Sequence, residues 1–437
     1  AGINVTASHN PKEYNGYKAY WTDGSQVTAP HDRNIIAEVE KITSIDQILT
    51  GANPGNITLL GEEFDEIYLN KVHTLSLSPE SVGKFHDMKI AYTPLHGAGV
   101  RLVPASLRKW GFTNVSLVEE QAVIDGNFPT VESPNPEERK TMAKAIELGS
   151  RLGADLVLAT DPDSDHIGVA LRNAKGEYVL LNGNQTLSLI MAYQLTRWSE
   201  LGRLDGKEFV VKTIVTSQMP NVMAAHFGVK CYDCLTGFKY IARIIRNNEG
   251  KATYIGGGEE SFGYLAGDFV RDKDAVSACS LVAEAAAWTR DTMGLTLYEW
   301  LQKLYVEFGF FREGLVSVVR KGMEGAAEIQ QMMVDYRADP PREIAGSPVV
   351  KINDFKLLES TDVRTGAKTP IEEEASNVLQ WFAADGTVVS VRPSGTEPKI
   401  KFYFGVRAEL ESVADFDRVE AGLDAKIETI KKELKLV

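Results

Sequence analysis

The stretch Ala154–Gly168, ADLVLATDPDSDHIG, is an apolar run followed directly by three aspartates. The apolar run is typical of a buried strand. Asp161, Asp163 and Asp165 come at every second position after it, and in extended backbone this spacing puts three carboxylates on one side. Strands that end in polar ligand-bearing loops are typical of α/β sheets, so this stretch predicts an α/β fold with a site at the end of one strand.

Strands and helices also alternate before and after this stretch. The segment 89–118 predicts a strand, a helix that ends at Gly111, and a second strand. The segment 208–234 repeats strand, helix and strand, and 252–264 (ATYIGGGEESFGY) ends a strand in a glycine-rich loop. Strands that alternate with helices indicate mixed or parallel sheets covered by helices.

After about Phe311 the pattern changes to alternating strands, in 313–322, 386–395 and 399–409. Lys426–Leu434 is expected to form a terminal charged helix, and the proline-rich 337–348 a loop. This part predicts a smaller, separate α+β domain.

Composition narrows the class of protein. The chain has 437 residues, 43% of them hydrophobic, and a net charge of −13. The negative charge argues against nonspecific nucleic-acid binding, and the apolar runs are too short to cross a membrane. Nothing at the start of the chain is typical of a signal peptide. The three cysteines, which include the pair Cys231 and Cys234, indicate ordinary thiols in a reducing compartment, so we expect a cytoplasmic protein.

The aspartate loop predicts a metal site. Three carboxylates this close repel one another unless a cation lies among them, and all-oxygen ligation favours Mg²⁺. An EF-hand also begins D-x-D-x-D, but here its glycine position holds His166 and its last ligand position holds Arg172. A solvated acidic turn is the alternative.

Three further loops are rich in polar side chains. In VRPSGTEPK (391–399), Ser394, Gly395 and Thr396 can form an anion nest beside the guanidinium of Arg392, although Pro-Ser-Gly is also a routine turn. In GGGEESFGY (256–264), the carboxylates can accept hydrogen bonds from sugar hydroxyls, although a flexible loop explains the pattern equally well.

The last loop, GINVTASHNP (2–11), sets Ser8 beside His9. The pair suggests a nucleophile and its base, yet adjacent side chains usually point apart, and a capped turn is the alternative. Taken together, a hydroxyl, a hard-metal site, an anion nest and a sugar loop are the parts of a phosphoryl-transfer enzyme for a phosphosugar.

The four loops, in this order along almost the whole chain, resemble the α-D-phosphohexomutase family. TASHNP resembles its phosphoserine loop, DPDSD its Mg²⁺ loop, GEESFG its sugar loop and RPSGTEPK its phosphate loop. Together with LTGFKY and VRDKDAV nearby, the residues of these motifs are most similar to those of the phosphoglucomutase branch. Phosphomannomutase, phosphopentomutase and a non-catalytic sugar-phosphate-binding fragment stay open as alternatives, and the oligomeric state is not predicted.

The resemblance implies a mechanism. Ser8 would carry a phosphoryl group, with Mg²⁺ between that phosphate and the three aspartates. The phosphate would pass to glucose 1-phosphate, and the bisphosphate would turn over and release glucose 6-phosphate. Lys18 matches a lysine for proton transfer, which needs a depressed pKa that neighbouring cations could supply, and His9 would shape the loop.

The resemblance also implies substrate contacts. Glu259 and Ser261 would hold the ring hydroxyls, and the phosphate that is not reacting would contact Arg392, Ser394, Gly395, Thr396 and Lys399. Further substrate contacts are expected from His166, Gly237, Lys239 and Lys273.

The family architecture implies three related α/β domains and a smaller α+β domain. We expect them at 1–83, 84–204, 205–311 and 312–437, with the N-terminal part of the first domain missing. One residue departs from the family pattern, because position 166 is His where Arg is usual. Histidine is shorter and is neutral above about pH 6.5 unless its pKa is shifted, so His166→Arg is expected to raise turnover.

Overall fold

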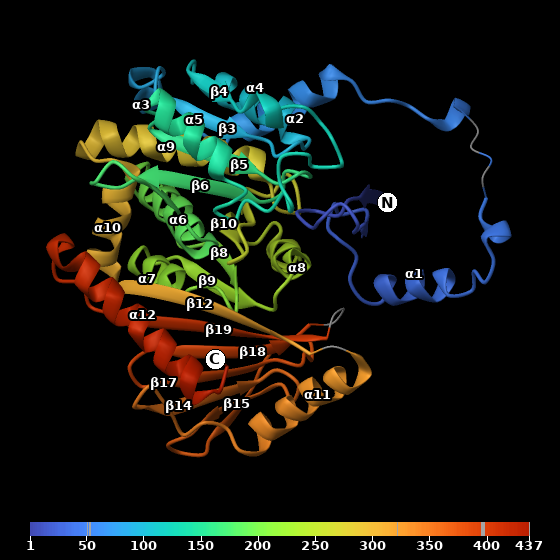
Figure 1. The fold of residues 1–437 in the computed structure, drawn as a ribbon, viewed down its shortest axis with the longest axis vertical. Helices are drawn as coiled ribbons and strands as arrows, with labels where there is room; N and C mark the ends of the chain where they lie inside the picture. The colour runs from blue at the N-terminus through green and yellow to red at the C-terminus, as the bar shows by residue number, and fades with distance from the viewer. Residues whose placement is uncertain (50, 52–53, 321, 395–397, 437) are drawn as a thin grey trace. The chain divides into compact units, whose positions relative to one another are not determined.

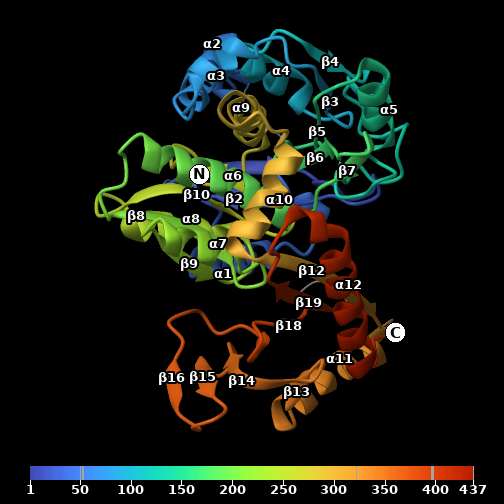
Figure 2. The same ribbon diagram turned by 90° about the vertical axis from the view of Figure 1, so that its left-hand side faces the viewer.

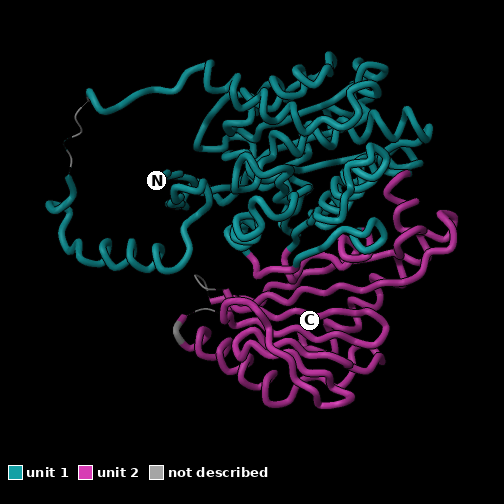
Figure 3. The backbone as a smooth tube through the Cα atoms, turned by 180° about the vertical axis from the view of Figure 1, so that it is seen from behind, with its two compact units in different colours: residues 1–212, 224–232, 237–299 teal, residues 213–223, 233–236, 300–437 magenta. Residues whose placement is uncertain are grey.

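The computed structural model describes residues 1–49, 51, 54–320, 322–394 and 398–436, and Figures 1 and 2 label most of their helices and strands. The residues group into two compact units (Figure 3). Unit 1 comprises 1–212, 224–232 and 237–299, and unit 2 comprises 213–223, 233–236 and 300–437. The four domain boundaries expected from the sequence stay a prediction.

A five-stranded mixed sheet in unit 1 carries the aspartate loop. Its order is β4-β3-β5-β6-β7, with β3, β4 and β5 parallel and β6 and β7 antiparallel. The strands are β3 (Ile90–Thr93), β4 (Val115–Leu117), β5 (Leu156–Thr160), β6 (Ile167–Arg172) and β7 (Tyr178–Leu180). Every residue of β5 is buried, because the strand is central and covered on both faces. The predicted strand before the aspartates is confirmed.

A second sheet has the order β11-β10-β8-β9, in which β10 is parallel to β8 and antiparallel to β11. Its strands are β8 (Glu208–Thr213), β9 (Lys230–Cys234), β10 (Thr253–Gly258) and β11 (Tyr264–Ala266). Near the N-terminus, β1 (Gly2–Val5) pairs antiparallel with β2 (Tyr17–Tyr20). The TASHNP loop lies in the connection of this hairpin.

Several helices of unit 1 pack on its sheets, whereas the first helix, His31–Val39, buries no residue. Helix α4 ends where predicted, because Gly111 adopts φ of 115°, a conformation that favours glycine at a helix C-terminus. The helices are α1 (His31–Val39), α2 (Glu62–His73), α3 (Pro79–Lys84), α4 (Gly99–Trp110), α5 (Ala143–Leu152), α6 (Gly183–Glu200), α8 (Phe238–Asn248) and α9 (Ala275–Met293); α7 (Met219–His226) and α10 (Leu297–Phe308) contribute residues to both units. Short 3-10 helices are η1 (Ile45–Gln47), η2 (Pro54–Asn56), η3 (Glu119–Gln121) and η4 (Val413–Asp415).

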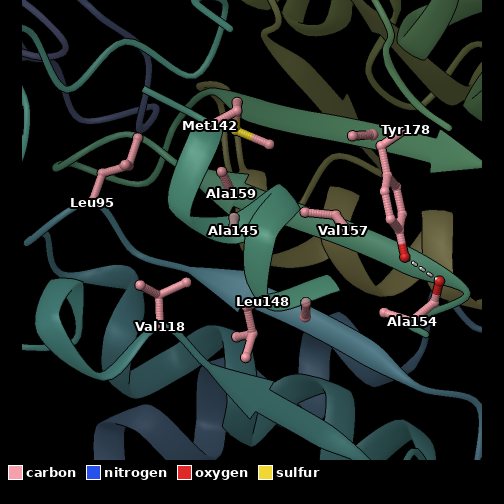
Figure 4. Close-up of a cluster of buried hydrophobic side chains, with 11 residues drawn as sticks. Leu95, Val118, Met142, Ala145, Leu148, Ala154, Val157, Ala159 and Tyr178 are labelled. Atoms are coloured by element: carbon pink, nitrogen blue, oxygen red, sulfur yellow. Dashed lines mark hydrogen bonds between the residues drawn. The ribbon is translucent and has the colours of Figure 1, made fainter. Parts of the chain in front are cut away.

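A hydrophobic cluster joins α5 to the five-stranded sheet (Figure 4). Met142, Ala145 and Leu148 lie on the helix side, and Val157 and Ala159 come from β5. Burying such side chains stabilises the fold by about 1.5–3 kcal/mol for each large one. This packing fixes β5, and with it the loop that follows.

Glu284 of α9 anchors the connection between α2 and α3. The side chain is fully buried and accepts hydrogen bonds from the Leu77 and Ser78 amides, at 2.9 and 3.0 Å. The hydroxyls of Ser76 and Tyr193 donate to the same carboxylate. Four donors compensate for the burial of this acid, so residues 76–78 are fastened to α9.

Unit 2 is built on an antiparallel sheet with the order β12-β19-β18-β17-β14-β15-β16, and β13 pairs with β14. Its strands are β12 (Phe310–Val319), β13 (Glu343–Ile344), β14 (Ser347–Asp354), β15 (Glu359–Asp362), β16 (Lys368–Pro370), β17 (Leu379–Ala383), β18 (Val388–Pro393) and β19 (Lys399–Ala408), and its helices include α11 (Gly322–Ala338) and α12 (Phe416–Glu433). The predicted change of pattern after Phe311 is confirmed by this sheet.

The terminal helix is longer than predicted, since it begins at Phe416 rather than Lys426. Leu423, Ile427 and Ile430 are buried at helical spacing, and this apolar face extends the helix beyond the charged residues that first suggested it. Helix α11 was not predicted. Among the described helices, none has both the length and the apolar character that crossing a membrane requires.

Candidate active site

Two loops and the N-terminal hairpin meet in unit 1. The aspartate loop, 161–166, connects β5 to β6, and the glycine-rich loop, 259–263, connects β10 to β11. The Ile167 amide donates to the Phe262 carbonyl at 3.0 Å, and the Ala275 amide donates to the Ser164 carbonyl at 3.0 Å. Backbone hydrogen bonds therefore fasten the aspartate loop to the glycine-rich loop and to the start of α9.

Asp161 is fully buried at the end of β5. Its Oδ1 accepts the amides of Asp165 and His166, at 3.1 and 3.0 Å. Its Oδ2 lies 2.8 Å from His166 Nδ1. Burial would raise the pKa of Asp161, but the charge and hydrogen bonds of His166 outweigh burial and hold the pKa well below its ordinary value. Asp161 is therefore an ionised carboxylate in the interior.

Oxygens of Asp161, Asp163 and Asp165 lie within 4.8 Å of one another. Burial and the two neighbouring carboxylates raise the pKa of Asp163 to about 6. Its Oδ1 is buried and has no hydrogen-bond partner among the described residues. An unpartnered carboxylate oxygen beside two other carboxylates fits a hard divalent cation, which takes oxygen ligands. The chain therefore has an acidic metal-binding group at the predicted position.

Ser8 lies against this group. Its hydroxyl donates to Asp161 Oδ2 at 3.1 Å and lies 3.1 Å from His9 Nδ1. The backbone of Ser8 has φ of 52°, an uncommon conformation for a residue other than glycine, and its amide donates to Thr6 Oγ1 at 2.8 Å. Ser133 Oγ donates to the His9 carbonyl at 2.7 Å. The loop thus holds the Ser8 hydroxyl toward the aspartates.

Two lysines share one carboxylate oxygen. Lys18 Nζ and Lys273 Nζ each lie 3.1 Å from Asp165 Oδ2, and Lys18 also lies 3.2 Å from Asp163 Oδ2. Burial would lower the pKa of Lys18, but Asp165 and Asp163 outweigh it and raise the pKa. The depressed pKa expected from the sequence is therefore wrong for this arrangement, in which Lys18 is an ammonium group.

His166 is buried between two of the aspartates. Nδ1 lies 2.8 Å from Asp161 Oδ2 and 2.5 Å from Asp165 Oδ1, and the His9 ring packs edge-on at a centroid distance of 4.9 Å. Burial would lower the pKa of His166, but the charges of Asp165 and Asp161 raise it to about 10. The ring is therefore charged at neutral pH, where an unshifted histidine would be neutral.

The glycine-rich loop brings one predicted sugar contact into the interior. Glu259 is buried and accepts the Gly237 amide at 2.9 Å. Gly237 has φ of 117°, a conformation that side chains rarely adopt, so this contact favours glycine. Burial raises the pKa of Glu259. Ser261 lies in the same loop and is half-buried, whereas the Lys239 ammonium lies over the Tyr240 ring at 5.2 Å.

The predicted phosphate loop belongs to unit 2. Arg392 lies at the end of β18 and Lys399 at the start of β19, and the Ser394 amide donates to the Lys399 carbonyl at 2.8 Å. Gly395 and Thr396 lie outside the described residues. The two strands therefore form a hairpin that ends at this loop, and its role in holding phosphate stays a prediction.

Sequence reasoning missed two residues. The Tyr20 hydroxyl donates to Asp272 Oδ2 at 2.7 Å, and Asp272 Oδ1 lies 3.4 Å from Lys273 Nζ. Tyr20 follows Lys18 at the spacing that points to the same face of a strand, which is the signal that could have found it. The pair supports the lysine that contacts Asp165.

A half-buried serine beside an acidic metal-binding group, on α/β sheets, is typical of an enzyme of the phosphoryl-transferring class. Comparison with protein families matches residues 1–46, 66–176, 182–308 and 350–423 to phosphoglucomutase/phosphomannomutase domains I, II, III and the C-terminal domain. The chain belongs to the phosphoglucomutase/phosphomannomutase family. The resemblance and the fold class predicted from the sequence, three α/β domains and a C-terminal domain, are both confirmed.

Curated relatives support the same assignment. Phosphoglucomutases of Staphylococcus aureus strains MRSA252 and N315 are 34% and 35% identical over 431 residues, which is 98% of this chain and 75% of theirs. Among solved structures, a phosphoglucomutase/phosphomannomutase family protein from Burkholderia thailandensis has a TM-score of 0.65 at 17% identity, over 98% of this chain and 76% of that one. An Aspergillus fumigatus N-acetylphosphoglucosamine mutase with GlcNAc-6P and magnesium has a TM-score of 0.53 at 14% identity, over 98% and 88%. These structures share the fold.

Proposed function

We propose that this chain is a phosphoglucomutase, which interconverts glucose 1-phosphate and glucose 6-phosphate through a phosphorylated Ser8. The observation that carries the proposal is the contact of the Ser8 hydroxyl with Asp161, 3.1 Å apart, in a group of three carboxylates faced by Lys18, Lys273 and His166. A hydroxyl in this setting can carry a phosphoryl group whose charge is compensated.

The reaction has two matched halves. The bond between phosphorus and Ser8 Oγ breaks as a bond to a hydroxyl oxygen of glucose 1-phosphate forms, and the proton of that hydroxyl ends on Ser8 Oγ. The resulting glucose 1,6-bisphosphate then returns its other phosphate to Ser8 Oγ, and glucose 6-phosphate leaves. The net reaction is an isomerisation that consumes no water.

The residues around Ser8 have distinct roles in this scheme. His9 Nδ1, 3.1 Å from the Ser8 hydroxyl, can exchange a proton with it. Lys18 acts as an ammonium group that positions Asp163 and Asp165 rather than as a base, because its pKa is raised. Asp161, Asp163 and Asp165 would hold Mg²⁺, which when bound would neutralise charge on the transferred phosphoryl group.

Glu259 and Ser261 are proposed to bind the sugar hydroxyls that both orientations share. The buried Glu259 supports this role, because its Oε1 accepts the Gly237 amide while a carboxylate can accept more than one donor. Arg392, Ser394, Gly395, Thr396 and Lys399 are proposed to hold the phosphate that is not reacting, with Lys239 as a further contact.

Mass spectrometry of the intact protein tests the proposal. We expect a phosphate-sized increment on Ser8 that glucose 1-phosphate discharges. The variant Ser8→Ala should lose the label and at least about a thousandfold in turnover, as expected when a nucleophile is removed. The matched variant Ser199→Ala, at an exposed serine of α6, should keep both. A protein that binds glucose 1-phosphate but never carries the label would instead be a sugar-phosphate-binding protein.

Substrate and metal need separate measurements. Turnover on the 1-phosphates of glucose, mannose and ribose ranks the sugars, and a preference for mannose or ribose would replace the phosphoglucomutase assignment. Removal of metal with a chelator should abolish turnover, and added Mg²⁺ should restore it. Restoration only by a transition metal would contradict the Mg²⁺ assignment.

A further inference from the structure

A cavity of about 320 Å³ lies in unit 1 at the opposite end of the strands that carry the aspartate loop. Asp155, which lines the cavity, directly precedes β5, and Arg172, also in its lining, is the last residue of β6. The aspartate loop connects the other ends of these two strands. A strand of this length spans about 15 Å, so the cavity is separate from the Ser8 site.

Two guanidinium groups line the cavity. Arg172 Nη2 donates to the Ala154 carbonyl at 2.6 Å, and the group lies over the Tyr178 ring at 5.5 Å. Arg290 Nη1 lies 3.3 Å from Asp155 Oδ1, and this group lies over the Phe85 ring at 5.2 Å. A guanidinium has five donors in a fixed plane, so each of these groups keeps donors beyond the ones that position it.

The charge balance of the lining favours an anion. Two arginines face one carboxylate, Asp155, which also accepts the Lys89 amide at 3.0 Å. Together the two guanidinium groups offer more donors than this one carboxylate can accept.

The remaining wall is apolar. Met88, Leu171 and Leu297 are buried hydrophobic residues that line the cavity. Cavities of about 300 Å³ or more that combine an apolar wall with a few convergent polar groups are typical of small-molecule sites. In Figure 1, β6 ends on the side of the unit where α9 ends and α10 begins.

We propose that this cavity binds a small organic anion. Its phosphate or carboxylate would take donors from Arg172 and Arg290, and its short carbon body would pack on the apolar wall. The proposal goes beyond the proposed mutase reaction, since it uses none of the residues around Ser8.

Calorimetric titration with phenyl phosphate tests the proposal, with benzoate as the carboxylate probe and phenol as the neutral control. We expect both anions to bind and phenol to bind at least about tenfold more weakly, because a charged hydrogen bond is lost. The tighter of the two anions identifies the oxyanion that the site prefers.

Two variants change the cavity in different ways. Arg290→Gln removes a charge at an exposed side chain, and Ala286→Phe fills the cavity without changing charge. Each should weaken phenyl phosphate binding about tenfold or more. The exposed Arg151→Gln, outside the lining, should leave binding unchanged and controls for net charge.

The Lys18→Gln variant separates this cavity from the Ser8 site. Binding of phenyl phosphate that persists in Lys18→Gln but weakens in both cavity variants supports the proposal, whether or not Ser8 proves to carry phosphate. Binding that is unchanged in Arg290→Gln and Ala286→Phe, or that is lost only in Lys18→Gln, would overturn it.

Discussion

Asp354 in unit 2 and the three aspartates in unit 1 show two ways to hold carboxylates in a protein interior. Asp354 has a single guanidinium partner, since Arg337 donates from Nε at 2.8 Å and from Nη2 at 3.3 Å. It also accepts the Lys356 amide at 2.9 Å. One-to-one pairing with added backbone donors compensates for burial, and this is the arrangement of a structural ion pair.

The aspartates of unit 1 are not paired in this way. Lys18 and Lys273 share one oxygen of Asp165, His166 bridges Asp161 and Asp165, and Asp163 keeps a buried oxygen without a partner. Carboxylates that share cations or lack a partner contribute less to the stability of the fold than carboxylates paired one to one. The charges around Ser8 therefore suit a bound cation and a phosphate better than they suit one another. Substitutions there should change turnover, whereas substitutions at Asp354 should change the free energy of unfolding.

The largest expected effect is on turnover, in Asp163→Asn. Losing a metal ligand should lower turnover by about a thousandfold, in the range found when a group that stabilises charge in the transition state is removed. The metal-free variant should be as stable as the parent or more stable, because a like charge has been removed from the cluster. Steady-state kinetics and urea unfolding check both parts, and a destabilised variant would place Asp163 with the structural carboxylates.

His166→Gln should lower turnover by about a hundredfold, since the neutral amide leaves Asp161 and Asp165 without the cation that bridges them. The contacts also change what we expect of His166→Arg. The site is buried and the histidine is already charged, so the longer side chain should not raise turnover as expected from the sequence. Steady-state kinetics of the two variants at saturating Mg²⁺ test both expectations. A His166→Arg variant faster than the parent would support the prediction made from the sequence.

Asp354→Ala should show the opposite pattern. Removing the acid leaves the Arg337 guanidinium, whose side chain is only 16% exposed, without its partner. The cost is about 3 kcal/mol of unfolding free energy, and turnover at a temperature where the variant is folded should stay within about threefold of the parent. Urea unfolding gives the first quantity. A loss of turnover without a loss of stability would contradict the comparison.

The smallest expected effect concerns Glu313 of β12. Burial raises the pKa of this carboxyl to about 7, although its hydrogen bond with Ser217 acts in the opposite direction. A raised pKa means that the folded state binds the proton more tightly than the unfolded state, so the contribution of Glu313 to stability is present below about pH 4.5 and is lost as the pH rises toward 7.

Glu313→Gln removes this pH dependence. The variant should match the parent near pH 5 and should be more stable by about 1–2 kcal/mol at pH 8, a value reduced from the full shift because the side chain is partly exposed. Urea unfolding at both pH values measures the difference. The exposed Glu411→Gln is the control and should change neither value.

The fold was predictable where the chain repeats one simple pattern. The apolar run before Asp161 is a buried strand as predicted, and the glycine at 111 ends the helix as expected. Helix α11 was missed, because its buried residues, such as Ile329 and Met333, are few among polar neighbours. A strand buried on both faces is therefore easier to predict from the sequence than a helix that buries only a narrow face.

The candidate site was predictable as a set of residues but not as a set of contacts. The loops containing Ser8 and Asp161 were each recognised, and they do meet. The sharing of Asp165 by Lys18 and Lys273, however, joins segments far apart in the chain. Only the folded backbone brings these charges together, and the raised pKa of Lys18 follows from that proximity rather than from any local motif.

Glu284 fixes the position of the connection between α2 and α3. The Glu284 carboxylate accepts four hydrogen bonds from residues 76–78 and Tyr193. These bonds hold the short connection between α2 and α3 in one position against α9. Helix α9 is in turn tied to the aspartate loop, because the amide of its first residue, Ala275, donates to the Ser164 carbonyl. A single buried acid thus fastens the connection between α2 and α3 to the same helix that begins beside the aspartate loop.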